Sequence, residues 1–219
     1  MTHPRSAGSG SRRIPLFGLL AALALGGASA ADPASDFKPT PLSPQPDRDA
    51  GLRAFSEIER VLKHPRCLNC HVPDAPLQGN QATPHFPPVQ RGKDGRGQAP
   101  LQCTTCHSIQ NSPLLHAPPG LAKNGKPDWH MPPAHMKMNW VGLSGAALCR
   151  AVRDPKTNGG KSLAATEEHL VNDPLVAWGW QPGPGRELPP LDKAAFDERT
   201  REWIRNGAPC APGDAPLTR

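Results

Sequence analysis

The chain has 219 residues, of which 29 are proline and 21 are glycine, whereas only 37% are apolar and 5% are aromatic. This composition excludes a transmembrane bundle, a coiled coil and a large β-sandwich, and it favours one domain with many irregular loops. The formal net charge is +6, but the basic residues are scattered and do not alternate with aromatic residues, so no nucleic-acid partner is expected.

Residues 1–30 have the pattern of a secretory signal peptide. Two arginines precede an apolar run that begins at Ile14, and the small residues 28–30 fit a cleavage site. The run is shorter than the roughly 20 apolar residues that span a bilayer. Export to a bacterial periplasm is therefore expected, and the alternative is an uncleaved membrane anchor. Cleavage would remove three arginines and no acid, which lowers the net charge to +3.

A proline-rich leader and a helix are expected next. Residues 31–48 predict an extended leader or tether that does not pack as an element. Residues 49–63 predict a helix, because apolar residues recur along them at three- and four-residue spacing. His64-Pro65 ends this helix, since the residue before a proline is pushed out of helical conformation. Residues 49–219 are expected to form a single domain.

The rest of the chain predicts loops followed by helices. Between residues 67 and 140 no periodicity is sustained, so loops and short turns are expected there. Three helices are predicted further on: residues 144–153, residues 166–171, and a helix from Asp192 to Gly207. Ser144, Thr166 and Asp192 are the expected N-caps. The last helix carries Trp203 and is expected to pack against the helix at 49–63. The predicted fold class is mainly α with extensive Pro/Gly-rich irregular loops.

Two C-x-x-C-H motifs carry the strongest functional signal, CLNCH at 67–71 and CTTCH at 103–107. This is the attachment signature of c-type haem. Thiols three positions apart can form thioethers to the two vinyl-derived carbons of the porphyrin, and the next residue then supplies an imidazole to the iron. Two covalently bound haems are therefore expected, with four cysteines for attachment and two histidines as iron ligands: Cys67, Cys70, Cys103, Cys106, His71 and His107.

Two other uses of paired cysteines, a zinc site and a redox pair, are alternatives to haem attachment. Zinc ribbons also contain two C-x-x-C pairs, but here 32 residues separate the pairs, which is longer than the common ribbon spacing. A thioredoxin-like redox pair would lie in a βαβ pattern, which neither motif has. An oxidising compartment also disfavours free thiolates. Haem is the preferred interpretation.

Methionine is the first candidate for a second axial ligand. After Met1, every methionine lies within eight residues, at Met131, Met136 and Met138. Such clustering in a proline-rich loop indicates an axial thioether supply, and Met–His ligation raises the reduction potential. Met138 is the first choice and Met131 the second.

Histidine is expected as the other distal ligand, and His85 is the first candidate because it lies between the two motifs. Five other histidines are alternatives: His64, His116, His130, His135 and His169. A five-coordinate iron is a further alternative, which would permit peroxide or small-gas chemistry.

Cys149 and Cys210 remain, and in an exported protein they predict a disulfide. Closing a loop of that length contributes on the order of 4 kcal/mol in the chain-entropy model. Two free thiols, or a thiolate axial ligand, are the alternatives.

Four stretches resemble a family of small exported dihaem cytochromes c that are labelled isoquinoline 1-oxidoreductase subunits: HPRCLNCH, CTTCH, NGGK at 158–161 and VAWGWQPGPGR at 176–186. The resemblance covers most of the chain after about residue 50 and implies a cytochrome c-like fold. The catalytic subunits of such molybdenum hydroxylases are a large molybdopterin subunit and a small two-iron–two-sulfur subunit. This chain is too short for the first, and its cysteines do not suit the second. The resemblance therefore implies an accessory electron acceptor.

The expected function is electron transfer by an exported dihaem c-type cytochrome that is not catalytic by itself. Its electrons would come from a periplasmic or membrane-associated dehydrogenase, such as a molybdenum hydroxylase, and pass to a downstream cytochrome or oxidase. One alternative is a dihaem peroxidase-like enzyme with one open haem and an acid/base pair from Glu167, Glu168 and His169. The other is a zinc-stabilised binding module.

Overall fold

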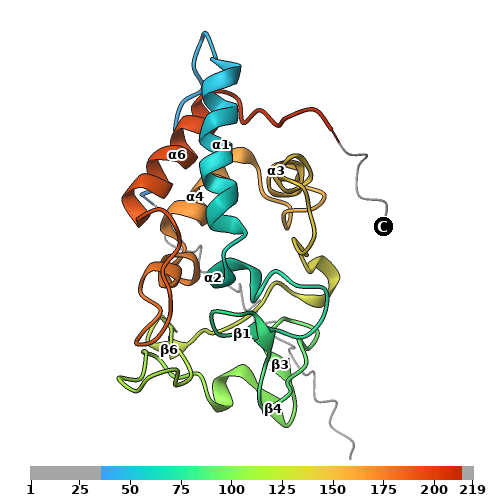
Figure 1. Ribbon diagram of the computed structural model, residues 1–219, viewed down its shortest axis with the longest axis vertical. Coiled ribbons are helices and arrows are strands. Elements are labelled where there is room, and N and C mark those ends of the chain that lie inside the picture. The colour runs from blue at the N-terminus through green and yellow to red at the C-terminus, as the bar shows by residue number, and fades with distance from the viewer. Residues whose placement is uncertain (1–35, 214–219) are drawn as a thin grey trace, which may run out of the picture. The chain divides into compact units, whose positions relative to one another are not determined.

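The computed structural model describes residues 36–213, which consist mainly of helices and irregular loops (Figure 1). The predicted signal peptide at 1–30 lies outside the described residues, as does the start of the leader at 31–35. Phe37 begins the unit that holds every element described below. No helix within residues 36–213 combines the length and the apolar character needed to cross a membrane.

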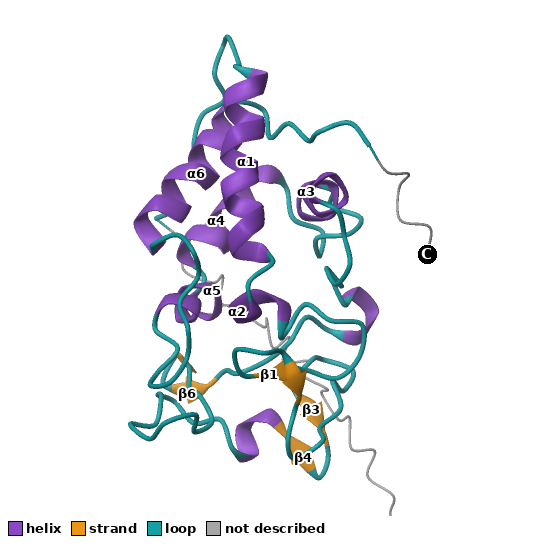
Figure 2. Ribbon diagram, in the orientation of Figure 1, coloured by secondary structure: helices purple, strands orange, loops and turns teal. Residues whose placement is uncertain are grey.

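Helices dominate the regular structure, which confirms the expected mainly α class with irregular loops (Figure 2). Six α-helices lie in the described residues: α1 Arg48–Leu62, α2 Pro65–Leu68, α3 Gly145–Arg153, α4 Leu163–Asn172, α5 Pro174–Ala177 and α6 Lys193–Arg205. Three antiparallel pairs of two-residue strands accompany them: β1 Leu77–Gln78 with β2 Thr83–Pro84, β3 Gly97–Gln98 with β4 Leu101–Gln102, and β5 Ala122–Lys123 with β6 Lys126–Pro127. Three 3-10 turns complete the structure: η1 Cys103–Thr105, η2 Ala134–Met136 and η3 Trp178–Trp180.

The hydrophobic core lies among the longer helices. α1 and α6 lie side by side, as the sequence predicts, and α3 and α4 pack against them (Figure 1). The ring centroids of Phe55 and Trp203 are 5.1 Å apart at the α1–α6 contact. Ile58 and Leu148 are fully buried in the same cluster. Burial of these apolar side chains stabilises the helices more than the helix propensity of the individual residues does.

Side-chain caps set where the helices begin. Ser144 accepts a hydrogen bond from the amide of Ala147, and Asp192 accepts one from Ala195, so both predicted N-caps are confirmed. The prediction for Thr166 is wrong, because α4 begins at Leu163 and its cap is Ser162. Thr166 instead lies buried within the helix, where its hydroxyl accepts a hydrogen bond from Asn158.

Two short helices begin at prolines, one of which, Pro65, was predicted only as the end of the preceding helix. Pro65 follows the end of α1 and occupies the first turn of α2, the helix that carries Cys67. Pro174 likewise follows the end of α4 and occupies the first turn of α5, directly after the N-cap Asp173. Proline suits this position, because its missing N–H would have no helical partner and its φ is already helical.

Residues 36–47 of the predicted leader contain no helix or strand, and residue 48 already begins α1, but this segment is held against the helices. Thr40 donates two hydrogen bonds to the carboxylate of Glu167, at 3.0 Å from its amide and 2.6 Å from its hydroxyl. The amide of Ser43 donates to the carbonyl of Arg205 at the end of α6 (2.8 Å). Polar anchors, not apolar periodicity, therefore fix this segment.

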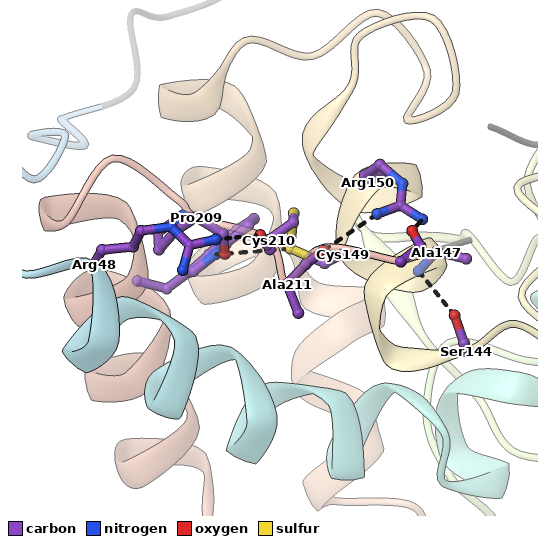
Figure 3. The surroundings of a disulfide bond; sticks show 10 residues. Arg48, Ser144, Ala147, Cys149, Arg150, Pro209, Cys210 and Ala211 are labelled. Atoms are coloured by element: carbon purple, nitrogen blue, oxygen red, sulfur yellow. Dashed lines mark hydrogen bonds between the residues drawn. A yellow bond between two sulfur atoms is a disulfide. The ribbon is translucent and has the colours of Figure 1, made fainter. Parts of the chain in front are cut away.

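The predicted disulfide is present between Cys149 of α3 and Cys210, which follows α6 (Figure 3). Its Cα atoms are 5.6 Å apart, within the usual range. The neighbouring carbonyl of Pro209 accepts a hydrogen bond from the indole of Trp203 (3.1 Å), and that of Cys210 accepts one from Arg48 (3.3 Å). The chain after α6 is thus tied to α1, α3 and α6.

Candidate functional site

The first C-x-x-C-H motif lies where α2 gives way to a turn. Cys67 is in the helix, and Cys70 and His71 follow it, with the amides of both donating to the carbonyl of Cys67. All three residues line a cavity of about 330 Å³, which we call the His71 cavity. Its wall also contains Trp180 and Phe196, which join it to the helical core.

The imidazole of His71 is fixed on two sides. Its Nδ1 donates to the backbone carbonyl of Met138 at 3.0 Å. Its face is stacked on the indole of Trp140, with ring centroids 3.4 Å apart and planes within 1° of parallel. Because Nδ1 carries the proton, Nε2 keeps its lone pair and can bind a metal.

The second motif begins in the turn η1, and Cys106 and His107 follow this turn. Cys103, Cys106 and His107 line another cavity, of about 430 Å³, which we call the His107 cavity. His107 donates from Nδ1 to the carbonyl of Pro119 (2.7 Å), and its ring stacks on Trp129 with centroids 4.9 Å apart. The second motif therefore repeats the arrangement of the first, with one backbone carbonyl and one indole orienting the imidazole.

A network from the segment after α5 supports the second site. Trp178 contacts Trp129 edge to face, with centroids 4.6 Å apart, and its indole nitrogen donates to Asn111 (3.1 Å). The side chain of Arg186 donates to the carbonyl of Ala117 at 2.5 Å. These contacts give a structural role to the WGWQPGPGR stretch and hold the loop that carries Pro119.

His85 belongs to the second cavity as well. Both His85 and His107 line it, and their ring centroids are 6.2 Å apart. His85 donates from Nδ1 to the carbonyl of Pro87 (2.9 Å), as the motif histidines do to theirs. Imidazoles on opposite sides of one metal have ring centres about 6 Å apart, because the metal–nitrogen bond is about 2 Å and the ring centre lies about 1 Å further. The pair is thus spaced for a shared metal.

The methionines lie at the first site and between the two sites. Met131 is buried and lines both cavities, whereas Met136 and Met138 line only the His71 cavity. Met138 has a positive φ of 49° and presents its carbonyl to His71. The side chain expected as an axial thioether therefore belongs to a residue whose backbone already orients the motif histidine.

The two cavities share a wall. Five residues line both: Arg66, Cys70, Trp129, Met131 and Trp178. The charge of the Cys103 thiolate is close enough to raise the pKa of Cys70 further, beyond the effect of burial. The two C-x-x-C-H motifs therefore line adjacent cavities although 32 residues separate their cysteine pairs in sequence.

Burial keeps the candidate ligands neutral. It lowers the pKa of His71 to about 3 and that of His107 to about 4, so both imidazoles are unprotonated at neutral pH. Burial also raises the pKa of Cys67 to about 12 and that of Cys70 to about 11, which holds these thiols protonated. Metal binding requires a neutral imidazole, so the histidines are prepared for it.

Two buried N–H donors on the cavity walls have no hydrogen-bond acceptor among the described residues. Nε of Arg66, which lines both cavities, has no hydrogen-bond partner there, nor does the indole nitrogen of Trp140 at the His71 cavity. Such groups are costly to bury unpaired. A cofactor with an apolar body and carboxylate substituents would fit these walls, and haem has both features. The residues present therefore fit haem.

The alternatives lack comparable support. No three His, Cys, Asp or Glu side chains within residues 36–213 converge to hold a metal ion, as a zinc ribbon would require. The carboxylate of Glu167, one candidate acid/base group, is fully buried and bonded to Thr40.

The remaining histidines are distributed over both sites. His64 caps α2, where its Nδ1 accepts from the amide of Arg66, and His116 lines the His107 cavity. His130, His135 and His169 line the His71 cavity. Sequence reasoning did not identify Trp129, Trp140 and Trp178 as supports of the motif histidines. Their concentration in a chain with only 5% aromatic residues is the signal that would have indicated them.

No family model, curated protein or solved structure matches the chain. The functional interpretation therefore depends on the geometry of the two sites.

Proposed function

We propose that this protein is an exported c-type cytochrome that binds two haems and transfers electrons between redox partners. Cys67, Cys70 and His71 would hold one haem at the His71 cavity. Cys103, Cys106 and His107 would hold the other at the His107 cavity, with His85 on the opposite side. Bound haem supplies reversible one-electron transfer at a potential set by its axial ligands and surroundings.

The repetition of one arrangement at both motifs carries this proposal. Each motif brings two thiols and an imidazole to a cavity wall, and each imidazole has a carbonyl at Nδ1 and an indole at its face. A metal-ligating histidine is usually oriented by such a hydrogen bond from its second nitrogen. The arrangement also supports a cytochrome c-like class for the fold.

The residues of the chain would act as follows. The two thiols of each motif would hold the haem through thioethers to its vinyl-derived carbons, an addition of S–H across a double bond that would need no oxidant. The carbonyls of Met138 and Pro119 keep Nε2 of each motif histidine free for iron. The unpaired N–H groups of Arg66 and Trp140 would donate to the carboxylates of the cofactor.

The shared wall supports transfer between the two sites. Trp129, Met131 and Trp178 are among the residues that line both cavities, so the two sites are adjacent. Electrons would enter from a periplasmic or membrane-associated dehydrogenase, such as a molybdenum hydroxylase, and leave to a downstream cytochrome or oxidase. The chain would serve as an electron-transfer subunit and not as a catalyst by itself.

A haem count tests the proposal. The full chain is expressed with export and c-type haem maturation, and its mass is taken after denaturation together with a reduced visible spectrum. We expect two covalent haems per chain and sharp c-type bands. A chain without covalent haem, or one that binds zinc through its cysteines, would overturn the proposal. The matched control replaces Cys149 and Cys210 with alanine and should keep both haems.

A further inference from the structure

Positive side chains line both cavities. Arg66 lines the two of them, whereas Lys161 lines only the His71 cavity and Arg186 lines only the His107 cavity. Of the aspartates and glutamates within residues 36–213, none lines either cavity. A cofactor with carboxylate substituents would therefore meet opposite charge at these walls and no like charge.

Arg66 is the most deeply buried of these three cations. Its exposed fraction is only 7%, whereas Lys161 and Arg186 are half-buried. One terminal nitrogen of its guanidinium donates to the carbonyl of Gly79 at 2.7 Å and to the side-chain oxygen of Asn80 at 3.1 Å. Both acceptors are uncharged and lie in the turn between β1 and β2, so they hold the guanidinium without neutralising it.

No acid within residues 36–213 compensates the charge of Arg66. The ion pairs found in this part of the chain do not include it. Its Nε also has no hydrogen-bond partner there. A buried guanidinium without a counter-charge is costly, and a carboxylate is the acceptor that compensates it best. Because haem carries propionate carboxylates, the unpaired Nε and the missing counter-charge indicate the same kind of partner.

We propose that Arg66 is a cation shared by the two haems and that it raises both of their reduction potentials. This inference rests on the proposed function. Reduction adds an electron to a haem, so a positive charge nearby stabilises the reduced form more than the oxidised form. Burial keeps solvent and salt from screening this charge. Because Arg66 lines both cavities, the effect extends to both haems.

Lys161 and Arg186 would act on one haem each, because each lines only one of the two cavities. The ammonium of Lys161 donates to one backbone carbonyl (3.3 Å), and the guanidinium of Arg186 donates to two (3.1 and 2.5 Å). Arg66 would thus shift both potentials in the same direction. The two unshared cations would instead set the difference between the potentials, which decides the direction in which an electron passes between the haems.

Spectroelectrochemical titration of the dihaem protein tests this role, after the haem count has established two haems per chain. Arg66→Met removes the charge and keeps an unbranched side chain. We expect both midpoint potentials to fall and the difference between them to change little. A fall in one potential alone, or in neither, would overturn the shared role while leaving the proposed function intact. A chain without haem would overturn the proposed function itself.

The unshared cations provide matched variants in the same titration. Lys161→Met should lower one of the two potentials, and Arg186→Met should lower the other. The difference between the potentials therefore changes in opposite directions in these two variants. If either variant lowers both potentials as Arg66→Met does, the distinction between a shared cation and unshared cations is wrong.

Changes at Asn80 test the charge of Arg66 with the arginine still in place, and they decide the matter if Arg66→Met fails to fold. Asn80→Asp keeps an oxygen for the guanidinium and adds a negative charge beside it, so both potentials should fall. Asn80→Ala removes the contact without adding charge and should leave both potentials close to those of the unmodified protein. Equal falls in the two variants would assign the effect to lost contacts and overturn the electrostatic role.

Discussion

The helical region and the loop region of this molecule obtain their order in different ways. α1, α3, α4 and α6 surround a continuous cluster of buried side chains, including Phe196 and Trp203, and a disulfide closes it. Within residues 69–140, the buried apolar side chains are Val72, Met131 and Trp140. The only regular elements described in that region are two-residue strands and 3-10 turns.

The loop region is arranged around its two cavities instead of around a core of its own. Its indoles and imidazoles stack at the cavity walls, and Leu77, Val89 and Leu101 also line the His107 cavity. Other large apolar residues of the region are exposed, such as Leu114 at 69% and Leu115 at 71%. A chain that buries little apolar surface needs another source of stability. The comparison therefore indicates that haem would complete the loop region, whereas the helical region can fold by side-chain packing.

Loss of one attachment site should have the largest effect on this difference. Cys103→Ala with Cys106→Ala removes both thioethers at the second site, so we expect one covalent haem instead of two. The amides near His107 should lose protection from hydrogen exchange, while those of α1 and α6 keep theirs. Denatured mass and hydrogen exchange measure the two effects.

The matching pair Cys67→Ala with Cys70→Ala should also leave one haem. Retention of both haems in either variant would contradict the assignment of that motif. Equal loss of protection in α1 and α6 would contradict the independence of the helical region.

A cavity in the helical core should destabilise the helical region and leave both haems bound. Trp203 is fully buried, stacks near Phe55 and donates to Pro209. Trp203→Ala should lower the free energy of unfolding by about 3–5 kcal/mol, as large core truncations do. Denaturant titration of the haem-loaded protein measures this, with exposed Leu188→Ala as the control, which should cost less than about 0.5 kcal/mol. Loss of haem from the tryptophan variant under native conditions would show that the two regions depend on each other.

The sequence predicted the helical region well because its signals are local. Apolar spacing located α1 and α6, and side-chain caps located the starts of α3 and α6. The predicted cap Thr166 lies one turn after the observed cap Ser162, because serine and threonine both cap helices and the difference of one turn depends on tertiary packing. In the structure Thr166 is taken up by Asn158, which also bonds the carbonyls of Val152 and Lys161.

The sites were predictable only where chemistry lies in adjacent residues. The two C-x-x-C-H motifs contain four thiols and two imidazoles that can be recognised from sequence alone. In the structure, the two thiols and the imidazole of each motif line one cavity. The residues that support the motif histidines come from far along the chain: Met138 is 67 positions from His71, and Trp178 is 67 positions from Asn111. No periodicity encodes such pairs, because they depend on how loops without regular structure cross in space.

Removal of the disulfide should weaken the helical region less than the Trp203 change. The bond closes a separation of 61 residues, and its loss should lower the free energy of unfolding by about 2–4 kcal/mol. Replacing both Cys149 and Cys210 with alanine avoids a free thiol. Denaturant titration should show this decrease with the visible spectrum of both haems unchanged. A changed spectrum would instead link α3 to the sites.

The smallest expected effect concerns the leader, which belongs to neither region by its own packing. The buried carboxylate of Glu167 accepts from both the amide and the hydroxyl of Thr40. Glu167→Gln replaces one acceptor oxygen by a donor, so one of these bonds is lost, and the variant should lose about 1–2 kcal/mol of stability.

The same change should increase proteolysis within residues 36–47, because the anchor to α4 is weakened. Thr40→Ala should give a similar increase, and the double variant should be little worse than either single one, since both remove the same contact. Fully additive losses in the double variant would show that Glu167 acts elsewhere, and the 4.0 Å approach of Arg201 to its carboxylate would be the next contact to test.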